Sequence, residues 1–193
     1  MAIITPEKLL EFWFSDEIFP KIFTEDPWLD EKLREEYYST WAQATQGLLV
    51  DWRKTIRGRV AEIIVLDQFS RNIARGDRRS FAQDGMAVVL AQEVVLHPEY
   101  DTLDDNEKKF VLLPFMHSES LAIHEWAEPY FAALNDPKTQ DFEDQHVAVL
   151  EEFGRYPYQN KELGRKNTQE EEAFLERTQG KTYGDGKEEQ ESE

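Results

Sequence analysis

Three polar segments interrupt otherwise apolar, helix-like sequence, at residues 67–72, 114–119 and 146–165. Ordinary helix surfaces carry mainly Lys and Glu, whereas these segments carry Arg, His, Asn, Gln and Tyr. Such side chains bind ligands, and one another, through directed hydrogen bonds. We therefore expect one shared, anion-selective site if the three segments meet in space, and capping or loop roles if they do not.

The first segment offers an ion pair at helical spacing. Asp67 and Arg71 can pair across one turn of a helix, and Gln68 and Asn72 form a second such pair. The apolar run before Asp67 drives this end of the helix inward, and a buried carboxylate needs a partner such as Arg71. The alternative is a polar helix end at which Arg71 and Asn72 satisfy terminal carbonyl groups.

Two histidines are the candidate acid–base residues. His117 follows Pro114 at an expected break between helices, where the free N–H groups of the next helix favour an anion. His146 lies on the inward stripe of its own helix, as either a ligand-binding residue or a hydrogen-bonded core residue. Asp67 or Glu119 could orient one of these imidazoles for general acid–base catalysis.

The third segment ends in a loop rich in binding side chains. Arg155, Tyr156, Asn160 and Arg165 follow a helix that Gly154 terminates. A guanidinium group there could hold a carboxylate or phosphate through two parallel hydrogen bonds, and Tyr156 could form a wall. The alternative is an irregular connection with a purely structural role.

Composition and missing motifs narrow the function classes. The chain has no Cys, which excludes thiolate chemistry and disulfides, and its formal net charge of -18 argues against nucleic-acid binding. The window 53–79 is locally basic, so its Arg residues either bind a small anion or pair with acidic residues elsewhere. We expect no metal or cofactor, because no metal-ligand spacing or nucleotide-binding loop is present. No signal peptide or membrane-spanning run is evident, so we expect a cytoplasmic protein without a membrane partner.

Periodic apolar residues predict one helix after another and no strand. Start signals lie at Thr5-Pro6, Asp26-Pro27 and Thr168, and a further helix is expected over about 56–69. Further caps are expected at Asp84, at Asp104 or Asp105, and at Ser118. Pro114 should break or kink the helix before Ser118, and Thr139 or Asp141 should open the helix that follows. We expect a single helical domain over 1–178 and an acidic, disordered tail over 179–193.

The motifs Leu66-Asp67-Gln68-Phe69-Ser70-Arg71-Asn72-Ile73, Leu113-Pro114-Phe115-Met116-His117-Ser118-Glu119 and Phe153-Gly154-Arg155-Tyr156-Pro157 occur in this order. With them, the chain resembles the bacterial "domain of unknown function 924" family over about 1–178. The resemblance implies an all-α, tetratricopeptide-like right-handed superhelix of about seven to eight antiparallel helices. It implies no reaction. Tyr158 departs from the family pattern, which often has His, and is therefore a poor choice as an essential acid or base.

Three functions remain open on these residues. The first is a binding module that holds a small anionic ligand or a peptide in a pocket or groove lined by Arg, His and aromatic side chains. The second is an enzyme acting on a small anionic metabolite, with His117 or His146 as acid or base. The third is a buried polar network without a ligand. A closed pocket favours a small ligand or enzyme, an open groove favours a peptide, and complete internal pairing favours the network.

Overall fold

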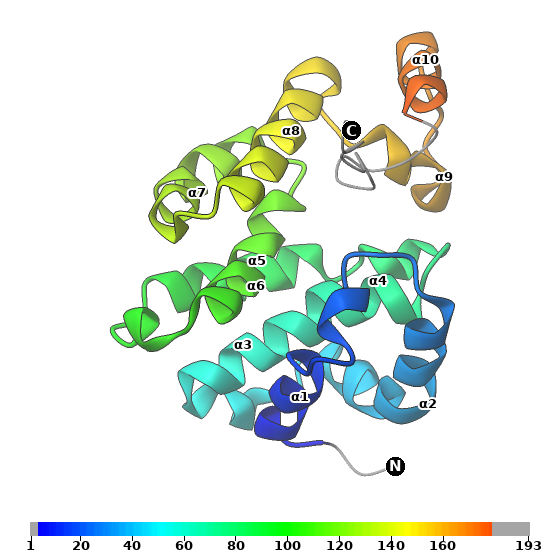
Figure 1. Cartoon of the computed structure of the whole chain (residues 1–193). Helices are drawn as coiled ribbons and strands as arrows, with labels where there is room; N and C mark the ends of the chain where they lie inside the picture. Colours follow the sequence, from blue (N-terminus) through cyan, green and yellow to red (C-terminus); the bar gives the residue numbers. More distant parts are fainter. Residues whose placement is uncertain (1–3, 179–193) are drawn as a thin grey trace, which may run out of the picture.

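The computed structural model describes residues 4–178, and the regular structure in this range is helical (Figure 1). The all-α class is therefore confirmed, while the tetratricopeptide-like superhelix stays a prediction. The acidic tail predicted over 179–193 lies outside the described residues. The α-helices are α1 (Pro6–Trp13), α2 (Pro27–Ala44), α3 (Ile56–Ile64), α4 (Ser70–Ile73), α5 (Asp84–Val95), α6 (Asp105–Met116), α7 (Leu121–Leu134), α8 (Pro137–Phe153), α9 (Asn160–Leu163) and α10 (Gln169–Arg177). Short 3₁₀ helices lie at Phe19–Lys21, Val50–Lys54, Arg78–Ser80, Tyr100–Thr102 and Pro157–Gln159.

Local capping signals set several helix starts as predicted. The Thr5 side chain accepts a hydrogen bond from the Lys8 N–H at the start of α1. The Asp26 side chain accepts one from the Leu29 N–H at the start of α2. Thr168 and Glu171 form a reciprocal capping box at the start of α10. These predictions are confirmed because each cap depends only on residues within one turn.

Other helix boundaries differ from the predictions. Pro114 does not break α6, which continues to Met116. A proline so close to the end of a helix removes only one late hydrogen bond, and its neighbours are buried. Ser118 is not a cap, because the N-cap of α7 is Ser120; helix α8 likewise starts earlier than predicted, after Asp136.

The central helix is interrupted by a wide turn. The segment Val65–Phe69 forms a π-helix between α3 and α4, so the helix predicted over about 56–69 extends to Ile73. All five residues of the π segment are buried. Because π turns occur often at functional sites, this interruption draws attention to the polar residues Asp67 and Gln68.

Helix α3 lies in the lower part of the view, whereas α7, α8, α9 and α10 lie in the upper part (Figure 1). Helices α1, α5 and α6 contact α3; α2 contacts α4; α7 packs on α6; and α8 packs on α7. Most buried apolar side chains form one core in this body. A smaller, separate core consists of Val149 and Leu150 from α8, Tyr156 from the following loop, and Phe174 from α10. Within residues 4–178, no helix combines the length and apolar character needed to cross a bilayer.

Candidate functional site

The three polar segments meet in space. His117 Nδ1 lies 2.8 Å from Asp67 Oδ1, which joins the first two segments. The ring centroids of His117 and His146 are 6.5 Å apart, and those of His146 and Tyr156 are 5.5 Å apart. The predicted convergence is therefore observed, and the individual contacts decide what the shared region can do.

Asp67 is the buried centre of this region. The π turn places its fully buried carboxylate 3.0 Å from Arg71 Nη1, and Gln68 Nε2 also donates to it at 2.5 Å. Burial alone would raise the pKa of Asp67, but Arg71 and His117 outweigh burial and lower the pKa to about 2. Asp67 is thus a carboxylate at neutral pH. The predicted pair with Arg71 is confirmed, whereas Gln68 pairs with Asp67 rather than with Asn72.

Arg71 links Asp67 to a second carboxylate. Its guanidinium donates two hydrogen bonds to Asp84, at 2.9 and 3.0 Å, and a third to the Asp67 backbone carbonyl at 2.9 Å. Burial lowers the pKa of Arg71, but the two carboxylates raise it by more, so the group stays charged. Burial also raises the pKa of Asp84. Asp84 was predicted as a cap, but it is the first residue of α5 and its side chain pairs with Arg71 instead.

His117 has one occupied and one free ring nitrogen. A carboxylate only accepts hydrogen bonds, so Nδ1, which faces Asp67, carries the hydrogen. In the neutral ring, Nε2 is then an acceptor. No residue within 4–178 bonds to Nε2, and the side chain remains 19% exposed. Asp67 therefore fixes the orientation of the His117 ring, and Nε2 can accept a hydrogen bond from a molecule in the space beside it.

That space is a pocket of about 310 Å³, here called the His117 pocket. It lies between the start of α5, the loop after α6 and the segment that leads into α9. Its lining residues are Phe81, Asp84, Gly85, Val88, His117, Ser118, Glu119, Gln159 and Leu163. Polar groups therefore share the wall with three apolar side chains.

His146 is held away from this wall. Its Nδ1 lies 2.7 Å from the Phe142 backbone oxygen, so Nδ1 donates there. Burial lowers the pKa of His146 to about 4, which keeps the ring neutral at physiological pH. His146 is thus a buried neighbour of His117 and Tyr156, and it does not line the pocket.

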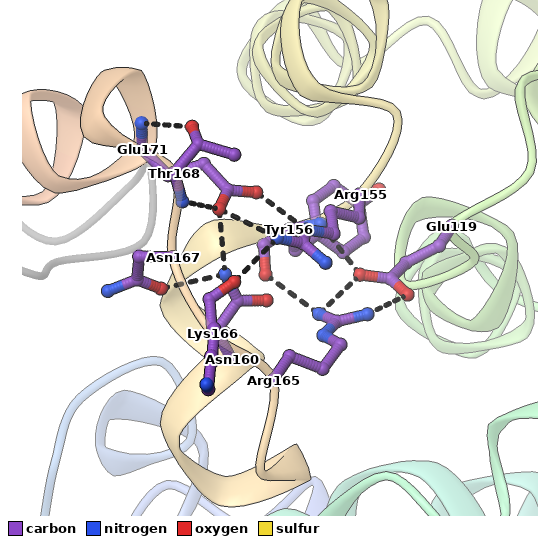
Figure 2. A network of polar contacts seen from close by, with 9 residues as sticks. All are labelled: Glu119, Arg155, Tyr156, Asn160, Arg165, Lys166, Asn167, Thr168 and Glu171. Carbon is purple, nitrogen blue, oxygen red and sulfur yellow. Dashed lines mark hydrogen bonds and ion pairs between the residues drawn. The ribbon is translucent and has the colours of Figure 1, made fainter.

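Glu119 lines the pocket but is already bonded. Arg165 donates two hydrogen bonds to its carboxylate, at 2.7 and 2.8 Å, and the Tyr156 backbone N–H donates a third at 2.7 Å (Figure 2). The Tyr156 hydroxyl donates to the Met116 backbone oxygen at 2.7 Å. These bonds attach the third polar segment to the second.

Arg155 and Asn160 belong to a different set of contacts, the C-terminal network (Figure 2). Arg155 donates two hydrogen bonds to Glu171, at 2.6 and 2.7 Å, and lowers the pKa of Glu171 to about 2. Asn160 donates to Asn167 Oδ1 at 2.8 Å. These contacts hold the start of α10 against the preceding loop, and neither Arg155 nor Asn160 lines the pocket.

Most of the other predicted cations and amides also have internal partners. Asn72 donates to Asp30 at 2.8 Å, on the contact between α2 and α4. The basic window 53–79 is largely paired with acids, as one of the two alternatives predicted; the pairs are Arg53–Glu62, Arg57–Glu107, Arg71–Asp84, Arg75–Asp30 and Arg79–Asp77. In the described part of the chain, no cluster of three His, Asp or Glu side chains is placed to hold a metal ion.

The sequence interpretation missed three polar residues of this region. Asp84 and Gln159 line the pocket, and nothing local in the sequence distinguishes them. His124 was not among the candidate histidines, yet it is buried and its Nδ1 lies 2.5 Å from Glu143 Oε1. Its spacing to the buried Ala127 and Phe131, three and seven residues on, was a signal that it faces inward.

Comparisons with known proteins give a family and a fold. The model of the family described as "Bacterial protein of unknown function (DUF924)" matches residues 9–179. A solved structure of a protein of unknown function from Agrobacterium tumefaciens is 27% identical, with a TM-score of 0.83, and the match covers 89% of this chain and 97% of that chain. No curated protein matches the chain.

Proposed function

This chain belongs to the bacterial DUF924 family, and we propose that it binds a small molecule in the His117 pocket. The observation that carries the proposal is the free Nε2 of His117, opposite the bond that joins Nδ1 to the buried Asp67. Orienting an imidazole with a buried carboxylate is an arrangement that ligand sites and active sites use. His146 also has one ring nitrogen without a partner among the described residues, but only His117 combines a carboxylate partner with a place in the pocket wall.

The size of the pocket supports a small ligand over a peptide. A volume of about 310 Å³ is at the lower end of small-molecule sites, which span roughly 300–1,000 Å³. The wall mixes apolar side chains with a few polar groups, which is also typical of such sites. The pocket is partly open to solvent, so its small size rather than its closure is what favours a small ligand over a peptide.

A second candidate function is acid–base catalysis on the bound molecule. The geometry favours His117 over His146 as the catalytic residue, because only His117 lines the pocket and has a carboxylate partner. Asp67 would be a positioning residue, since it touches His117 and not the pocket. Glu119 is the weaker candidate, because Arg165 and Tyr156 already bind it.

The test is a thermal-shift screen of a metabolite library that contains anionic, cationic and neutral compounds. A compound that binds only the folded state raises the melting temperature by mass action. We expect at least one compound to stabilise the wild type and the His97→Ala variant but not the His117→Ala variant. His97 is a matched control because it follows the opposite end of α5 and bonds the Glu99 N–H.

The structural alternative gives the opposite result. If the region is only a polar network, every stabilising compound acts equally on the wild type and on His117→Ala. That outcome would reject the proposed function.

A further inference from the structure

The start of α5 presents an unpaired donor to the His117 pocket. The N-cap of α5 is Gln83, which makes no side-chain capping bond, unlike Thr5, Asp26, Asp136 and Thr168 at other helices. The Gly85 N–H has no acceptor among residues 4–178, and Gly85 lines the pocket. A side-chain carbon added at Gly85 would meet nothing within 4 Å, so the backbone is open on this side.

An independent observation on the opposite wall points to the same ligand chemistry. Gln159 is only 5% exposed, and no described residue bonds its side-chain amide. The Gln159 amide atoms are not among the fully buried unpaired atoms of the described residues, so they keep contact with open space. Because Gln159 lines the pocket, a ligand there can satisfy its amide group.

The charged groups on the wall, in contrast, already have partners. Both oxygens of Asp84 accept from Arg71, and both oxygens of Glu119 accept from Arg165. The wall therefore lacks a free carboxylate for a cation and lacks a free guanidinium for an anion. Besides the acceptor Nε2 of His117, the wall offers donors without acceptors at Gly85 and Gln159, near the positive end of the α5 dipole.

We infer that the ligand of the His117 pocket is a small carboxylate with an apolar body. One oxygen accepts from the Gly85 N–H and the Gln159 amide, and binding takes up one proton, which lies between the other oxygen and the acceptor Nε2 of His117, because two acceptors cannot bond each other without a hydrogen. Its apolar part lies against the remaining wall, formed by Phe81, Val88 and Leu163. The inference rests on the proposed function, and it assigns the anion to helix and amide donors rather than to the guanidinium groups predicted from the sequence.

The probes are butyrate, butylammonium and butanol, which share one apolar body and differ in the polar group. Titration calorimetry on the full chain should give binding for butyrate and a weaker or undetectable signal for the other two. Preferential binding of butylammonium or butanol, or no binding of any probe, would overturn the carboxylate assignment.

Variants locate the donors. Gly85→Pro removes the N–H, while Gly85→Ala keeps it and measures the effect of added carbon alone. Butyrate should bind roughly tenfold more weakly to Gly85→Pro than to Gly85→Ala, and roughly tenfold more weakly to Gln159→Leu than to wild type. Gln46→Leu, at an exposed glutamine, is the control and should bind as wild type does.

Should the proline variant fail to fold, Gln159→Leu still decides the question. Wild-type affinity in Gln159→Leu would overturn the inference. The metabolite screen distinguishes this outcome from failure of the proposed function. If a neutral or cationic compound stabilises the protein and requires His117, ligand binding in the pocket is supported and only the carboxylate assignment is rejected.

Discussion

At the scale of single residues, the buried carboxylate of Asp67 organises the candidate site. It fixes the hydrogen of His117 on Nδ1 and shares Arg71 with Asp84. A buried charge of this kind persists only with partners on several sides. As a consequence, the His117 ring has a fixed orientation, and its Nε2 is a hydrogen-bond acceptor in the neutral ring.

Asp67→Asn should therefore destabilise the fold, because Arg71 and His117 lose a buried anionic partner. We expect a loss of about 3 kcal/mol in the free energy of unfolding at pH 7, measured by denaturant titration. The Asp67 pKa is lower in the folded state, at about 2, than in the unfolded chain. Its stabilisation is therefore present above about pH 4 and is lost as the pH falls towards 2, so wild type and variant should converge there. A difference that persists unchanged at pH 2 would contradict this assignment.

His146 predicts a second pH dependence, with the sign set by its lowered pKa. The folded protein keeps His146 neutral down to a pKa of about 4, whereas the unfolded chain takes up the proton near pH 6.5. Stability should fall as the pH drops from 6.5 to 4, by on the order of 3 kcal/mol. His146→Gln should flatten this part of the curve, while His97→Gln should keep the wild-type slope. Identical slopes in all three proteins would show that burial of His146 is not the cause.

At the scale of elements, close packing decides where helices can approach each other. Gly58 in α3 lies under the short helix Val50–Lys54, and a side-chain carbon built there would sit 1.9 Å from the Trp52 backbone oxygen. This contact holds in place the helix that carries the π turn. A glycine is thus required here by the neighbour rather than by its own backbone angles.

Gly58→Ala should destabilise the protein, although alanine favours a helix by about 1 kcal/mol over glycine. The clash with backbone should dominate, and we expect a net loss of about 2 kcal/mol in denaturant unfolding. Gly85→Ala, where the added carbon meets nothing within 4 Å, is the comparison and should not destabilise. A stabilised Gly58→Ala variant would contradict the packing at Trp52.

Whether a helix boundary depends on local or on distant contacts explains which elements the sequence could predict. Thr5, Asp26 and Thr168 were predicted correctly because a cap depends on neighbours within one turn. Ser118 was assigned wrongly as a cap because its position is set by a tertiary contact of its carbonyl oxygen, which lies 2.8 Å from His124 Nε2.

The site was predictable only in part for a related reason. Asp67 and Arg71 are four residues apart in one helical stretch, so their spacing predicted the ion pair. The bond from His117 to Asp67 spans 50 residues, and Gln159 reaches the pocket without any local motif. Arg155 looked like a ligand-binding residue because Glu171, its partner, is 16 residues away.

At the scale of the whole molecule, the His117 pocket lies where two packed parts meet. The main core holds α5 and α6, whereas Tyr156 and Phe174 belong to the smaller core next to α10. The Glu119–Arg165 pair and the Tyr156 hydrogen bonds join the two parts at the pocket. Sites between two such parts are common, because each part supplies one rigid wall.

Arg155→Ala should loosen the smaller part without unfolding the larger one. Glu171 would lose both guanidinium bonds, so amide hydrogen exchange should become faster in α10 and remain slow in α3. Arg79→Ala, which removes an exposed pair with Asp77, is the matched control and should change neither helix. Equal acceleration in α3 and α10 would indicate a single cooperative unit instead.

The measurement that tests the central claim most directly is a nitrogen NMR spectrum of the protein with labelled histidine, recorded alone and with the metabolite library. The account predicts that His117 carries its hydrogen on Nδ1, and that at least one compound shifts its Nε2 resonance while leaving His97 unchanged. A hydrogen on Nε2 in the free protein, or a His117 resonance that no compound perturbs, would contradict the claim that His117 serves a ligand.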